Sequence, residues 1–169
     1  RFPIEDLRPL GRSARGVNSM KLRAADTIIG CDIVPRNYDA DLLVVTSDGF
    51  GKRTKLSEFR TQNRGGIGLI ATKFKSNMSR LVALTIVEEK DEIMMVTANG
   101  IVTRIKAGDI SCQGRPATGV RAQNLTDNDT VVSVNKIVNT DKDDDGDTIP
   151  SGGCSIEDMT EGEQTTLTE

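Results

Sequence analysis

The chain has 169 residues, enough for one domain of ordinary size, and it contains no His and no Trp. Without His it lacks the usual general base and the commonest zinc ligand, which disfavours most hydrolytic and metal-dependent mechanisms. The formal charge of −3 hides a segregation, because residues 139–169 hold ten acidic residues and one basic residue, which leaves 21 basic against 15 acidic residues in 1–138. A basic body with an acidic tail is typical of proteins that contact nucleic acid.

Cysteines and apolar runs set further limits. The three cysteines lie far apart and form no Cys-x-x-Cys pair, as expected for reduced thiols in a cytosolic protein rather than for a disulfide framework. No apolar run reaches the length of a membrane span. We therefore expect no metal site and no contact with a membrane.

The sequence repeats itself with a period of about 50 residues, which is typical of propeller-like blades. A shift of 51 residues superposes eight identities between 42–69 and 93–120 without a gap. The most informative matches form a Gln, Arg, Gly pattern, at Gln62, Arg64 and Gly68 and at Gln113, Arg115 and Gly119, with Arg12 and Gly16 as an earlier copy. The sequence thus predicts three repeats, at about 1–38, 39–90 and 91–138. The first begins in its middle, as expected for a piece of a longer protein.

Short strands are the only elements that the periodicity predicts. In chain order they are 28–34, 42–46, 50–55, 81–87, 93–97, 101–106 and 131–138. Asp48-Gly49 and Asn99-Gly100 are strong hairpin signals, because both residue types at each place accept positive φ. Beyond 138 the hydrophobic periodicity ends, so 139–169 is predicted to be a disordered acidic tail. The predicted fold class is all-β.

Two cations recur on the returning strand of each predicted hairpin. Alternation places Arg104 and Lys106 on one face of 101–106, and Arg53 and Lys55 occupy the matching positions one repeat earlier. Two such side chains lie roughly 6.6 Å apart along a strand, a workable spacing for neighbouring phosphates of a nucleic acid. The alternative interpretation is a solvated strand face that binds nothing.

Glycines surround Arg64. Gly65, Gly66 and Gly68 leave the backbone bare, so that it can approach a phosphate and donate N–H groups while Arg64 adds a charge-assisted bond. The alternative is a tight connection in which glycine serves only geometry. Since one Gly recurs at this place in every repeat, Gly65 and Gly66, which occur only in the middle copy, are the better candidates for binding.

The stretch 62–68, Gln-Asn-Arg-Gly-Gly-Ile-Gly, resembles the box motif of the C-terminal domain of the A subunit of bacterial DNA gyrase (gyrase A), whose usual form is Gln-Arg-Arg-Gly-Gly-Lys-Gly. Residues 49–54, 91–97 and 114–120 are also similar to blades of that domain, and the resemblance covers about 1–138. Asn63 and Ile67 replace basic residues of the full box. We therefore interpret the stretch as a degenerate copy, with the full box upstream.

The resemblance implies a β-pinwheel, a propeller-like disc that wraps duplex DNA without reading its sequence and supports ATP-dependent negative supercoiling. This chain would supply the last three blades, a partial disc, and would not be an enzyme by itself. No cofactor, metal or catalytic residue is implied here, because ATP and Mg act elsewhere in the holoenzyme. The implied partners are double-stranded DNA, the remainder of gyrase A and, through it, the second gyrase polypeptide, gyrase B. The implied location is the bacterial cytoplasm, at the nucleoid, or a plastid.

The residues expected to contact DNA come from the recurring cations and the box-like stretch. They are Arg12, Arg15, Arg53, Lys55, Gln62, Arg64, Gly65, Gly66, Gly68, Arg104, Lys106 and Arg115. Two alternative functions stay open. One is the equivalent C-terminal domain of topoisomerase IV, whose box is missing. The other is a protein-binding propeller such as the chromosome-condensation-regulator repeats, which are rich in Gly-His and aromatic signatures that this chain lacks.

Overall fold

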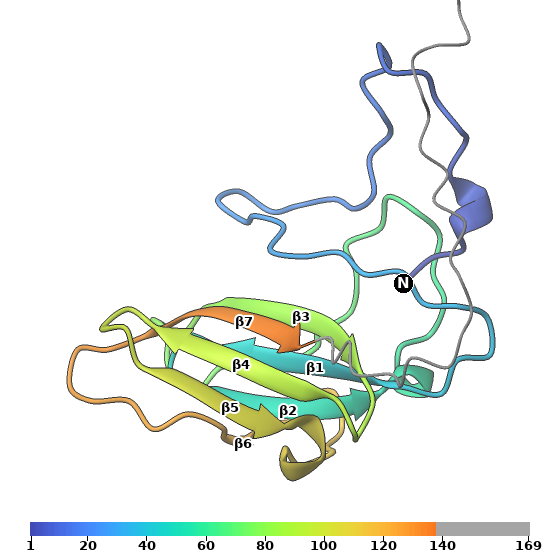
Figure 1. Ribbon diagram of the computed structural model, residues 1–169. Coiled ribbons are helices and arrows are strands. Elements are labelled where there is room, and N and C mark those ends of the chain that lie inside the picture. Colours follow the sequence, from blue (N-terminus) through green and yellow to red (C-terminus); the bar gives the residue numbers. More distant parts are fainter. Residues whose placement is uncertain (138–169) are drawn as a thin grey trace, which may run out of the picture. The chain divides into compact units, whose positions relative to one another are not determined.

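The strands of the protein form two antiparallel sheets (Figure 1). The structure is a computed structural model, and it describes residues 1–137. The strands are β1 (Asp41–Thr46), β2 (Phe50–Lys55), β3 (Leu81–Val87), β4 (Glu92–Thr97), β5 (Val102–Lys106), β6 (Val120–Arg121) and β7 (Val131–Ile137). Three single-turn 3-10 helices lie at Ile4–Asp6, Leu56–Glu58 and Ala107–Asp109. The all-β prediction is confirmed. The predicted acidic tail, 139–169, lies outside the described residues.

Each sheet is built on a tight hairpin. β1 pairs with β2, and β4 pairs with β5 one repeat later, both antiparallel. Gly49 and Gly100 take φ of 78° and 84° in the two turns, as the Asp-Gly and Asn-Gly signals predict. A third strand then joins the outer side of each first strand, giving the orders β3-β1-β2-β6 and β5-β4-β7. In residues 1–137 no helix is long and apolar enough to cross a bilayer.

The strand β6 crosses the repeat boundary. It belongs to the third predicted repeat but pairs with β2 of the second, with Arg121 opposite Phe50 and Val120 opposite Gly51. The matching stretch of the second repeat, 69–70, forms no strand, and Ile70 is 74% exposed. A two-residue strand needs an edge to pair with, and in 1–137 no hairpin stands beside 69–70.

Aliphatic side chains fill the space on both faces of β1. Leu43 and Val45 on one face pack into a cluster with Ile93 and Met95 of β4. The other face packs against the 3-10 turn after β2 and the chain that precedes β1, through a second cluster of Ala40, Leu42, Val44, Leu56, Phe59 and Ile86. β1 is therefore buried along its whole length, which fixes the hairpin from which the candidate site is built.

The strand predicted at 28–34 is wrong. Residues 1–39 contain no strand, and Ile28 and Ile33 are exposed. A strand requires a partner for its backbone groups, and this apolar run has no hairpin of its own to join. It is held instead by Asp32, whose Oδ2 accepts hydrogen bonds from the Ile86 N–H at 2.9 Å and the Thr85 hydroxyl at 3.2 Å along the outer edge of β3.

Candidate nucleic-acid interface

Arg53 does not lie on the surface, so its expected role as an exposed partner of Lys55 is wrong. Its guanidinium is buried and forms an ion pair with Asp41, with Nη1 and Oδ2 2.8 Å apart. Nε donates to the carbonyl of Ile110 at 2.8 Å. Arg53 is buried because the chain of the third repeat, around Ile110, covers it, and alternation along the strand does not report such a cover.

The other two cations of β2, Lys52 and Lys55, differ in burial. Lys52 is fully buried, and its Nζ donates to the carbonyls of Gly114, at 2.7 Å, and Arg115. This burial lowers the pKa of the Lys52 ammonium. Lys55 is half exposed and lies 3.2 Å from Asp41 Oδ1, and hydrogen bonding to that carboxylate raises the pKa of the Lys55 ammonium. Lys55 is thus the cation of β2 that is accessible to a ligand.

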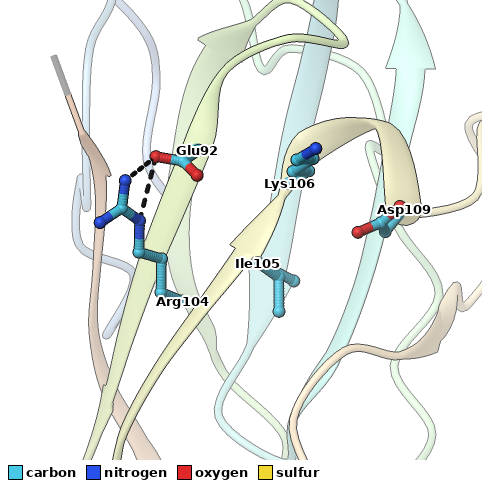
Figure 2. Close-up of a pocket in the computed structure, with 5 residues that line it drawn as sticks. All are labelled: Glu92, Arg104, Ile105, Lys106 and Asp109. Carbon is cyan, nitrogen blue, oxygen red and sulfur yellow. Dashed lines mark hydrogen bonds and ion pairs between the residues drawn. The ribbon is translucent and has the colours of Figure 1, made fainter. Parts of the chain in front are cut away.

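On β5 the predicted alternation holds. Arg104 and Lys106 are both exposed, and Figure 2 shows the Arg104 guanidinium turned toward Glu92, with Nε 3.0 Å from the carboxylate, while Lys106 lies further along the strand. These side chains line a depression of ≈ 410 Å³ together with Ile105 and Asp109. Arg104–Glu92 repeats the Arg53–Asp41 pair 51 residues later. The Arg53–Asp41 pair is buried because the third repeat packs over β2. The Arg104 side chain is exposed because, within 1–137, no later repeat packs over β5.

The glycine-rich stretch is partly committed to contacts within the protein. Gly65 and Gly68 both adopt φ of 80°, in the left-handed region that favours glycine. The N–H of Gly65 donates to the Ser19 carbonyl at 2.9 Å, so the expectation that it is offered to a phosphate is wrong. The N–H groups of Gly66 and Gly68 have no partner in the described part of the chain, and their binding of phosphate stays a prediction. The backbone N–H of Gln62 also has a protein partner, the Arg1 carbonyl, at 3.0 Å.

The recurring arginines differ in exposure. Arg12 and Arg15 are exposed, and neither has an ion-pair or hydrogen-bond partner among residues 1–137. Arg64 is half-buried, with Nη1 2.5 Å from the Asn18 carbonyl. Arg115 is half-buried too, and its guanidinium carbon lies 6.0 Å from the centre of the Phe59 ring. The assignment of Arg64 and Arg115 to phosphates stays a prediction, but both guanidinium groups already have protein contacts.

Sequence reasoning missed a cation cluster around Phe50, which we call the Phe50 cluster: Phe50, Lys75 and Arg121. The Lys75 ammonium lies 4.7 Å and the Arg121 guanidinium carbon 5.4 Å from the ring centre. Exposed cation–π contacts of this kind contribute about 0.5–1 kcal/mol each and hold both charges in place. The two cations come from different repeats, brought together because β6 pairs with β2. Neither recurs at a shift of 51, where Lys75 matches a Thr and Arg121 an Ile, so the repeat pattern carried no signal for them.

The chain is similar in sequence to a known family and to its curated members. A family model described as the DNA gyrase C-terminal domain, beta-propeller, matches residues 1–35, 40–88 and 91–138. The chain is 41% identical over 137 residues to the DNA gyrase A polypeptide of Staphylococcus epidermidis, a match that covers 81% of this chain. It spans only 15% of the length of that relative.

Two solved structures are similar to the described fold. A DNA gyrase A C-terminal domain superposes with a TM-score of 0.70 and 33% identity, covering 81% of this chain and 46% of that one. The C-terminal domain of a DNA topoisomerase IV superposes with a TM-score of 0.75 and 28% identity, covering 80% of this chain and 42% of that one. Both likenesses include sequence as well as fold.

Proposed function

Because the chain belongs to the family of DNA gyrase C-terminal domains, we propose that it binds duplex DNA without sequence preference and contributes to wrapping it. The Phe50 cluster carries the proposal, because it fixes two cations from neighbouring repeats beside one another. Other exposed cations add to it, namely Arg12, Arg15, Lys55, Arg104 and Lys106. Residues 1–138 also hold the surplus of basic over acidic side chains.

Wrapping requires many weak contacts rather than one strong one. Smoothly bending a site of a few tens of base pairs costs on the order of 1–6 kcal/mol, which the contacts with phosphates must offset. Contacts with the phosphate backbone carry no sequence information and fix position. Cations held on successive repeats meet both needs, since each repeat adds contacts along a path that the protein, and not the DNA sequence, defines.

The proposal extends to the assembly. In it, the chain is a non-catalytic part of gyrase A that works in the bacterial cytoplasm with the rest of gyrase A and with gyrase B, while strand cleavage and ATP hydrolysis take place elsewhere in the enzyme. The topoisomerase IV alternative draws support from the fold likeness, but among the two solved structures the sequence identity to the gyrase A domain is higher, 33% against 28%. The family match leaves the protein-binding propeller without support.

Salt titration of DNA affinity tests the proposed function. With the whole chain and mixed-sequence duplexes, log affinity is expected to fall linearly with log salt, by about 0.9 per phosphate neutralised. Neutralising the cluster with Lys75→Gln and Arg121→Gln is expected to make the slope shallower by about 2, equally for all sequences. The matched control exchanges the charges without removing them, Lys75→Arg with Arg121→Lys, and keeps the slope. Affinity that hardly responds to salt, or loss on one sequence only, would contradict the proposal.

A further inference from the structure

Successive repeats are joined by the same backbone hydrogen bonds. The N–H of Gln113 donates to the Arg53 carbonyl at 2.8 Å, just as the N–H of Gln62 donates to the Arg1 carbonyl. A second pair runs the other way, from the N–H of Lys73 to the Ala117 carbonyl at 3.3 Å, and from Lys21 to Gly66 at 2.9 Å. Gln113 and Ala117 stand 51 residues after Gln62 and Gly66, and Arg53 and Lys73 stand 52 residues after Arg1 and Lys21. The described chain therefore contains one joint between repeats, built twice.

The recurring arginine belongs to this joint. Nη1 of Arg64 donates to the Asn18 carbonyl at 2.5 Å, and Nη1 of Arg115 donates to the Ile70 carbonyl at 3.4 Å. Asn18 and Ile70 are equivalent, since each stands two residues after the left-handed glycine of its repeat. In both copies the guanidinium thus reaches back to the same carbonyl of the preceding repeat.

The surroundings of both arginines hold them toward the protein. Nε of Arg64 is buried and has no partner among residues 1–137, so this side of the guanidinium does not face solvent. The backbone of Arg115 forms two hydrogen bonds with the second repeat. Its N–H donates to Glu58 Oε2 at 3.1 Å, and its carbonyl accepts from the buried Lys52 ammonium. A side chain fixed in this way is poorly placed to follow a phosphate.

We propose that Arg64 and Arg115 are positioning residues that tie each repeat to the one before it, and that they set the path of bound DNA without contacting it. This inference rests on the proposed function for its consequence on DNA. The tie itself is a property of the protein alone. It fixes the angle between neighbouring repeats and hence the line along which their exposed cations stand.

The test compares Arg115→Gln and Arg115→Lys in the whole chain. Lysine keeps the charge that a phosphate needs but lacks the guanidinium fork that reaches the Ile70 carbonyl. Both variants are therefore expected to speed amide hydrogen exchange at Lys73 and Gln113, the neighbouring bonds of the joint, in the absence of DNA. With DNA, both are expected to keep the salt slope while the bend, followed by energy transfer between dyes on the duplex ends, relaxes. Arg64→Gln and Arg64→Lys repeat the comparison at the other joint, with Lys21 as the reporter amide.

Arg121→Gln is the matched control in the same repeat, because its side chain is exposed and its loss is expected to flatten the slope by about 0.9 without changing exchange at the joint. The inference is overturned if Arg115→Gln flattens the slope as Arg121→Gln does while Arg115→Lys behaves as the wild type, or if exchange at Lys73 and Gln113 is unchanged in both variants. If the wild-type chain binds no DNA, the proposed function fails, and the exchange measurement still decides whether the tie exists.

Discussion

Asp41→Ala is expected to lower the free energy of unfolding by about 3–5 kcal/mol, because it removes the buried counter-ion of the Arg53 guanidinium and leaves only the exposed carboxylate of Glu89, 3.3 Å from Nη1. Both side chains are nearly inaccessible, with residue exposures of 3% for Asp41 and 5% for Arg53. Carbonyl oxygens around Arg53 can accept its hydrogen bonds but cannot neutralise its charge, and the Glu89 carboxylate, whose side chain is 79% exposed, is screened by water. Urea unfolding followed by circular dichroism measures the loss.

The equivalent pair one repeat later supplies the control. Glu92→Ala removes the partner of Arg104, whose side chain is 59% exposed and regains water when the pair is broken. Its expected cost is below about 1 kcal/mol. Replacing both members of the buried pair, as in Asp41→Leu with Arg53→Met, is expected to recover much of the loss. Equal costs for Asp41→Ala and Glu92→Ala would show that burial of the pair has no energetic weight.

Gly119→Ala is expected to destabilise the protein by about 2–6 kcal/mol, from backbone strain and overpacking together. Gly119 has φ of 98°, and an added Cβ would lie 2.5 Å from the carbonyl oxygen of Gly51 and 2.9 Å from its carbonyl carbon. Gly51 cannot move away, since it is paired with β1 on one side and β6 on the other. The loss is measured as a shift of the midpoint of urea unfolding at constant slope.

Gly16→Ala at the matching position separates the two causes. Gly16 has φ of 78°, but an added Cβ would meet nothing within 4 Å. Only the left-handed conformation is then penalised, at about 1–2 kcal/mol. A cost for Gly119→Ala no greater than that for Gly16→Ala would mean that β2 yields at Gly51.

The hairpins were predictable because their signals are local. Asp48-Gly49 and Asn99-Gly100 state the turn geometry within two residues, and the flanking β-branched runs supply the strands. Family membership was also within reach, since the stretch 62–68 is short, specific and contiguous. Each of these features depends on neighbours in sequence, which a pattern can report.

Burial by another repeat could not be predicted in the same way. Arg53 and Arg104 stand in matching sequence contexts, yet one is buried and the other exposed, because the covering chain comes from the third repeat in the first case only. The strand expected at 28–34 failed for the related reason that an apolar run becomes a strand only beside a partner. The Phe50 cluster escaped notice because Lys75 and Arg121 meet through β6, a two-residue strand with no pattern of its own.

The pairing of β6 with a strand of the preceding repeat bears on how such a chain can gain or lose repeats during evolution. Among the described residues, the third period carries both a hairpin, β4 with β5, and an edge strand, β6, for the hairpin of the period before it. A duplication of such a period inserts an edge strand and a hairpin together, so the new junction repeats the existing pairing of β6 with β2. Lengthening the protein by whole periods of this kind therefore requires no new type of interface. An insertion of part of a period would leave one hairpin without its edge strand.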